Sequence, residues 1–165
     1  MRHDRGGWDV EFYADEQGRE PCREWADGLS AIKKAALTAG VEVVLAKLGT
    51  NVAATEFGKA LGGGLYELRI RQTAAQIRQR VAGLPPDDFG DYPPEAILLR
   101  VFFCTAGHKI ILLMSGYDKA EDPGPRRQNR EIENARKLMR ARDEAQKRTR
   151  KAARRRGVPA PLSPR

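Results

Sequence analysis

The fold is decided by residues 98–119, which read LLRVFFCTAGHKIILLMSGYDK. Two apolar runs, 98–104 and 109–115, are separated by a short segment that contains Gly107, and this order predicts a β-hairpin. The second run is apolar on both of its faces, a pattern that is typical of a central strand of a sheet. The hairpin therefore predicts the middle of a sheet, with other elements added around it.

The first strand of this hairpin carries an arginine in its middle. Alternation along a strand places Val101 and Phe103 on one face and Arg100 on the other. The second strand leads into Tyr117 and Lys119. The hairpin thus has one apolar face that suits a core and a second face whose polar residues suggest a function.

Segments before the hairpin predict one strand and two helices. Apolar and polar residues alternate over 8–13, which indicates a strand with one buried face. Pro21 is placed to begin a short helix, because proline is favoured at the first helical position. Ser30 can cap a second helix that ends at Gly49.

The rest of the chain predicts one more strand and a final helix. Residues 50–64 have the composition of a loop, and LYELRI at 65–70 alternates sharply, as a strand does. A short polar helix over 71–82 begins a long insertion, 71–96, that contains two pairs of prolines. A helix over 124–146 follows the hairpin. The predicted fold is an α+β domain, in the order β-α-α-β-β-β-α, with a small antiparallel-rich sheet backed by helices on one face.

Charge divides the chain into two parts. The 165 residues carry a formal charge of +8, yet residues 126–165 hold 15 Lys and Arg against 4 Asp and Glu, whereas residues 1–125 hold 15 against 18. We expect one domain over 1–145 and a basic, proline-containing disordered tail over 146–165. Such a tail favours an electrostatic arm for nucleic acid, and a solvated tail that only adds solubility is the alternative.

Several classes of protein are disfavoured by the same sequence. No apolar run of about 18 residues and no secretory signal is evident, so we expect a cytoplasmic protein without a membrane partner. Cys22 and Cys104 lie far apart and outside any Cys-x-x-Cys pattern, which indicates neither a disulfide framework nor a zinc site. His108 falls in the hairpin turn and is interpreted as a turn residue.

Five segments in chain order carry a family resemblance; they read VEFYADEQGREPCREW, GLYELRI, LLRVFFC, KIILLMSGYDK and EIENARKL. The series, which spans about residues 8–140, resembles the RelE/HigB superfamily of type II toxin–antitoxin toxins, and within it the phage-derived HigB-like branch. The resemblance implies a RelE-like sheet that holds RNA on the face opposite its helices. It also implies an endoribonuclease that cleaves mRNA, often on the ribosome, and a cognate antitoxin that neutralises it.

The resemblance assigns four candidate catalytic residues. Arg69 and Arg100 match the arginines of two neighbouring strands and are expected to bind the scissile phosphate, because a guanidinium fork can hold two phosphate oxygens. Lys119 is expected to stabilise charge or act as a general acid, and Tyr117 to stack on a base or donate its phenol proton. Ala120 stands where the family has a second lysine, a departure that bears on activity.

The remaining candidate residues are expected to contact RNA without metal or cofactor. Glu67 shares a strand face with Arg69 and is the available carboxylate base. The full set of expected RNA-binding residues is Glu67, Arg126, Arg127, Lys147 and Arg148. Two alternatives stay open: the strand arginines are salt-bridged to Glu67, or the protein is a non-catalytic RNA- or ribosome-binding relative of the same fold. A DNA-binding regulator is less favoured, because no helix-turn-helix is evident.

Overall fold

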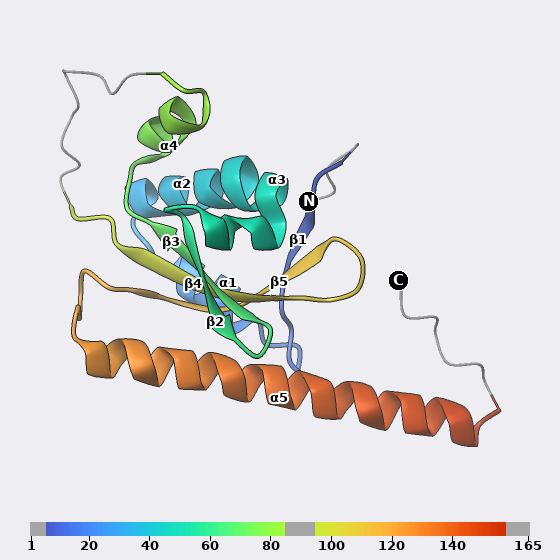
Figure 1. Ribbon diagram of the computed structural model, residues 1–165. Coiled ribbons are helices and arrows are strands. Elements are labelled where there is room, and N and C mark those ends of the chain that lie inside the picture. The colour runs from blue at the N-terminus through green and yellow to red at the C-terminus, as the bar shows by residue number, and fades with distance from the viewer. Residues whose placement is uncertain (1–5, 85–94, 158–165) are drawn as a thin grey trace.

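The computed structural model describes residues 6–84 and 95–157, which form an α+β domain around a five-stranded sheet (Figure 1). The strands are β1 (Asp9–Phe12), β2 (Gly58–Gly62), β3 (Leu65–Ile70), β4 (Leu99–Thr105) and β5 (Ile110–Asp118). The helices are α1 (Pro21–Asp27), α2 (Ala31–Ala39), α3 (Ala46–Leu48), α4 (Ala74–Val81) and α5 (Pro125–Arg155), with a π-helical segment η1 (Gly40–Leu45) and a 3-10 segment η2 (Gly49–Ala54).

The predicted hairpin is the centre of the sheet, whose strand order is β1-β5-β4-β3-β2. Strands β4 and β5 pair antiparallel, and Gly107 in their turn has a φ of +70°, which glycine adopts without strain. The central position predicted for the second apolar run is confirmed, since β5 lies between β4 and a parallel β1. Because β5 continues to Asp118, Tyr117 lies inside the sheet.

The predicted element order is wrong at residues 50–64. The structure forms β2 there, antiparallel to β3, and glycines 62–64 make a tight turn instead of a long loop. Strand β2 is an edge strand with mostly exposed side chains, so it has no apolar alternation to reveal it. The short helix predicted over 71–82 is present as α4, where Thr73 and Gln76 form a capping box.

Parts of three predictions lie outside the described residues. They are residues 85–94 of the insertion predicted over 71–96, residues 158–165 of the predicted tail, and the first five residues of the predicted domain.

One face of the sheet packs against the helices that precede β2. Val101 and Phe103 join the residues of α1, α2 and η1 in the main hydrophobic core. The segment Ala31–Ala54 is long and apolar enough to cross a membrane by length and composition alone, but half of its most apolar 18 residues are buried inside the domain. Its contacts with the sheet are those of a core helix in a small globular domain.

The other face of the sheet is covered by α5, which contradicts the expectation of helices on one face only. Helix α5 lies along the side of the sheet opposite α2 and α3 (Figure 1). Ala135 of α5 packs in a cluster with Leu65, Phe102 and Tyr117, and Met139 packs beside it. The reason is that an apolar sheet face must be buried against another element, and the final helix has a matching stripe.

Helix α5 is also longer than predicted. It has 31 residues and is therefore about 46 Å long at the usual rise of 1.5 Å per residue. Residues 146–155, predicted to begin a disordered tail, are its last turns. The basic composition of these residues is compatible with a helix because Ala, Arg and Lys are good helix formers.

Substitution of Gly116 tests how tightly α1 packs on β5. A Cβ atom at Gly116 would lie 2.3 Å from a carbon of the Trp25 indole ring, whereas one at Gly28 would meet only a carbonyl oxygen at 3.5 Å. We expect Gly116→Ala to lower the free energy of unfolding by about 1–3 kcal/mol, because the core is overpacked. Gly28→Ala, the control, is expected to be close to neutral. Urea unfolding of both variants checks this, and equal midpoints would contradict the packing.

Candidate functional site

Three of the four predicted catalytic residues lie side by side across the sheet. The strand register pairs Arg69 on β3 with Arg100 on β4, and pairs Arg100 with Tyr117 on β5. These positions are far apart in the sequence, and the ladder of three adjacent strands brings them into one row. The structure therefore gathers the residues that the sequence selected separately.

A buried carboxylate lies next to this row, two residues before Arg69 on the same strand. Glu67 is 0% exposed, and its Oε1 atom accepts a hydrogen bond of 2.7 Å from Nε of Arg69. Nε of Arg100 lies 3.8 Å from the same oxygen. The alternative in which the strand arginines pair with Glu67 is thus what the structure shows, and this one carboxylate offsets part of the repulsion between the two arginines.

Arg100 is an arginine held inside the domain. It is 3% exposed and donates from Nη1 to the carbonyl oxygen of Leu99 at 3.1 Å, while its Nε atom has no hydrogen-bond partner among the described residues. Burial lowers the pKa of this guanidinium, and the negative charge of Glu67 opposes that effect. The Nε–H of Arg100 is therefore a buried donor without an acceptor in the described part of the chain, and it is free to donate to an anionic oxygen of a ligand.

Tyr117 is the second residue of the row with unused polar capacity. Its ring is 1% exposed, stacks on Phe102 with centroids 6.1 Å apart, and lies 5.3 Å from the guanidinium carbon of Arg127. Its hydroxyl has no partner among the described residues. Burial, with a smaller contribution from Glu67, raises the pKa of this phenol, so it stays protonated at neutral pH and can donate a proton but not accept one.

The fourth predicted residue, Lys119, joins the cluster through a side chain that the sequence analysis missed. Lys119 Nζ donates to Oε1 of Gln128, and Nε2 of Gln128 donates to Oε2 of Glu67, each at 3.4 Å. A signal for Gln128 exists in the sequence, since it precedes the apolar Ile132 and Ala135 by four and seven residues on one helix face. We call Glu67, Arg69, Arg100, Tyr117, Lys119 and Gln128 the row cluster.

The predicted RNA-binding residues separate into two groups. Arg127 lies at the row cluster, half-buried and paired with Glu131 at 2.7 Å, and Glu67 lies inside it. Arg126 is exposed at the start of α5. Lys147 and Arg148 lie about 30 Å farther along the helix, on its exposed last turns, where Arg148 pairs with Glu16 at 2.7 Å. One helix thus carries two separate groups of cations.

The start of α5 closes the row cluster from solvent, contrary to the open face that the resemblance implied. Gln128 and Arg127 in its first two turns touch Glu67 and the ring of Tyr117. Of the residues of α5, Ala135 alone is buried, so few apolar contacts hold this end of the helix to the sheet.

Other reactive groups lie away from this cluster. Burial raises the pKa of the Cys22 thiol to about 12, and burial also raises the pKa of Cys104, so both are unreactive core thiols. His108 is exposed in the β4–β5 turn, as predicted. Within the described part of the chain, no three His, Cys, Asp or Glu side chains are grouped to hold a metal ion.

Comparison with protein-family models, with curated proteins and with solved structures found no match for this chain. The row cluster and the charge of α5 are the features of this chain that bear on its function.

The first prediction for this site concerns Glu67. Glu67→Gln removes the charge that faces Arg69 and Arg100, and we expect it to lower the free energy of unfolding by about 3 kcal/mol or more, because a buried cation loses its counter-ion. The control is Glu56→Gln, whose carboxylate pairs with Arg80 at 3.0 Å on the surface and is expected to contribute less than about 1 kcal/mol. Guanidinium unfolding compares the two, and similar losses would show that Glu67 does not hold the cluster together.

Proposed function

We propose that this protein is a metal-independent endoribonuclease toxin that cleaves mRNA, acts in the cytoplasm in association with the ribosome, and is neutralised by a cognate antitoxin. The observation that supports this best is the alignment of Arg69, Arg100 and Tyr117 in one row of the sheet. The resemblance to RelE/HigB toxins selects the same three residues from the sequence alone.

Each residue of the row has a role in cleavage by the 2′-hydroxyl of the RNA. The reaction needs that hydroxyl deprotonated, the charge on the phosphorane stabilised and the leaving 5′-oxygen protonated. Arg69 and Arg100 bind the phosphate oxygens, and the unpartnered Nε of Arg100 is one donor available to them. Tyr117, protonated and unpartnered, is the proton donor, and Lys119 adds positive charge. Glu67 is the carboxylate that accepts the proton of the 2′-hydroxyl once Arg69 turns to the phosphate.

Access to this site requires the first turns of α5 to leave the sheet. Arg100 and Tyr117 are too deeply buried to meet a phosphate in the closed arrangement. The two hydrogen bonds of Gln128 are long, at 3.4 Å. The N-cap residue is Gly124, which has no side chain to cap the helix. A polyanion that competes for the arginines replaces the charge of Glu67 and stabilises the open form.

The last turns of α5 supply the affinity for RNA. Residues 145–156 contain seven Lys and Arg and no Asp or Glu, and almost all are exposed. A helix of this charge releases counterions from phosphates without reading sequence. The same cations suit the acidic surface of an antitoxin, which then competes with RNA.

A non-catalytic RNA- or ribosome-binding protein is the second candidate function. Ala120 in place of the family's second lysine and the burial of Arg100 favour it. In that case the row cluster is a structural ion cluster, and the basic turns of α5 carry the function.

Tyr117→Phe separates catalysis from stability. The hydroxyl has no partner in the described residues, so its removal is expected to leave the free energy of unfolding unchanged or slightly raised. If Tyr117 donates the proton to the leaving oxygen, the rate of cleavage falls by about 100-fold or more. Purified ribosomes carrying an mRNA, with primer extension to map new 5′ ends, measure this rate.

Ser115→Ala is the matched control, because it also removes a buried hydroxyl without a partner but lies outside the row. Its cleavage rate is expected to equal that of the wild type. Wild-type protein that yields no new 5′ ends and no growth arrest on induced expression would refute the toxin and leave the binding protein.

The salt dependence of RNA binding tests the role of the α5 end. Lys151→Gln with Arg155→Gln removes two exposed cations, and we expect the slope of log K against log salt for single-stranded RNA to fall by about 1.4. The control pair, Lys34→Gln with Lys47→Gln, removes two exposed cations elsewhere and is expected to leave the slope unchanged. Equal slopes for the two pairs would show that RNA binding depends on the total charge of the protein and not on cations at the end of α5. Fluorescence anisotropy over a series of salt concentrations gives the slopes.

A further inference from the structure

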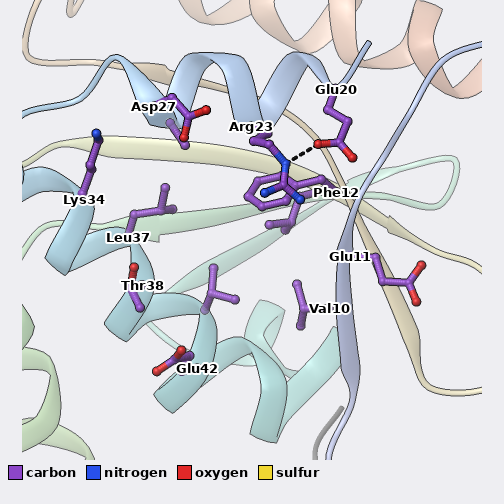
Figure 2. Close-up of a pocket in the computed structure, with 13 residues that line it drawn as sticks. Val10, Glu11, Phe12, Glu20, Arg23, Asp27, Lys34, Leu37, Thr38 and Glu42 are labelled. Carbon is purple, nitrogen blue, oxygen red and sulfur yellow. Dashed lines mark hydrogen bonds and ion pairs between the residues drawn. The ribbon is translucent and has the colours of Figure 1, made fainter. Parts of the chain in front are cut away.

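A cavity of about 590 Å³ lies between β1 and the two helices that follow it, on the face of the sheet opposite α5 (Figure 2). Its apolar lining consists of Val10, Phe12, Ala26, Leu37, Val41 and Leu113. The guanidinium of Arg23, paired with Glu20, lies 4.6 Å from the centre of the Phe12 ring and forms one wall. The volume is in the range of ligand pockets, and nothing in the row cluster uses it.

The strand beside this cavity has a free backbone edge. The N–H of Asp9 donates to the carbonyl of Lys109, just before β5, at 2.9 Å, and the N–H of Tyr13 donates to Leu113 of β5 at 3.0 Å. Alternation therefore directs the backbone groups of Val10 and Phe12 away from β5. The N–H of Trp8 also points away from β5 but donates to the carbonyl of Ala46, which closes the edge at that end. Among the described strands β1 pairs with β5 alone, and its outer edge at Val10 and Phe12 is unpaired. Unpaired strand edges are templates for another chain.

Charge around this edge is opposite in sign to the charge of the protein. Glu11, Asp27 and Glu42 line the cavity and make no ion pair with the described residues. Apart from Arg23, which pairs with Glu20, the cation that lines the cavity is Lys34. Figure 2 shows that Glu11 points to the side of β1 away from the cavity, whereas Asp27 and Glu42 project from the helices. The protein as a whole carries a net charge of +8 and repels cations at long range. A cationic ligand is nevertheless favoured at this site, because the acidic side chains around the cavity attract it locally.

We propose that the β1 edge and its cavity bind an extended segment of a partner protein in which apolar residues alternate with Lys or Arg. The backbone edge calls for an extended chain, since a helix or a small molecule leaves the groups of Val10 and Phe12 unpaired. Side chains of an added strand alternate between its two faces, so one set enters the cavity and the other set lies beside Glu11. This interaction is separate from RNA cleavage and does not depend on it.

A peptide of about seven residues in which valine alternates with lysine is the probe, used with the full-length protein in fluorescence anisotropy. The first comparison peptide has the same composition with valines and lysines in separate blocks, and the second has glutamate in place of lysine. We expect the alternating lysine peptide to bind about 10-fold more tightly than either. Equal binding of the block peptide would overturn the proposal, because the alternating pattern would then not matter. Tighter binding of the glutamate peptide would also overturn it, because the net positive charge of the protein would then determine affinity.

Variants place the peptide on the edge. Val10→Pro removes an outward N–H and leaves the hydrogen bonds to β5 intact, so we expect the folded protein to lose peptide binding by about 10-fold. Glu42→Lys is expected to weaken binding by a similar factor, while Glu121→Lys, an exposed acidic position away from the cavity, leaves it unchanged. Circular dichroism confirms folding, and the two lysine variants decide the outcome if Val10→Pro does not fold. Equal affinities for these two variants would refute the site.

Self-association is the competing outcome. Sedimentation velocity of the wild type is expected to show no dimer that depends on this edge. A concentration-dependent dimer that is lost in Glu42→Lys but kept in Glu121→Lys would overturn the proposal and assign the edge to a second copy of the chain.

Discussion

The row cluster depends on the ionic contacts that the buried carboxylate of Glu67 makes with Arg69 and Arg100. Two arginines from adjacent strands face the same side of the sheet, and the carboxylate of Glu67 lowers the cost of holding their like charges close together. By offsetting part of this positive charge, Glu67 helps α5 to pack over that end of the sheet. The arrangement leaves Nε of Arg100 and the hydroxyl of Tyr117 without partners, which is costly in a purely structural cluster and useful in a site that receives a ligand.

Helix α5 connects the closed site with the charged surface. Its first turns cover the row cluster, and its last turns carry exposed cations that are suited to a polyanion. A ligand on the distal turns is thereby held on the same rigid element that must move for a phosphate to reach Arg100. In the proposed function, binding and opening are linked, because any ligand with higher affinity for the open form shifts the population toward it.

Sequence reasoning succeeded where the signal is local. The hairpin, its central strand and the face of Arg100 follow from alternation, which neighbouring residues determine. The short helix predicted over 71–82 is present as Ala74–Val81. Sequence reasoning failed for β2, because an exposed edge strand is held by pairing with β3 and not by its own apolar pattern. The end of α5 is helical although its basic composition predicts a disordered tail, because Ala, Arg and Lys are good helix formers.

The sequence by itself determined the α+β class and the identity of the residues on the polar face, because residue spacing specifies which side chains share a face of a strand. Only the tertiary structure decided that Arg69, Arg100 and Tyr117 form one row, since the register between strands depends on pairings distant in the sequence. It also decided that Gln128 closes the row and that the two arginines share the Glu67 carboxylate. Burial and charge pairing are properties of the assembled domain, and no local pattern in this chain contains them.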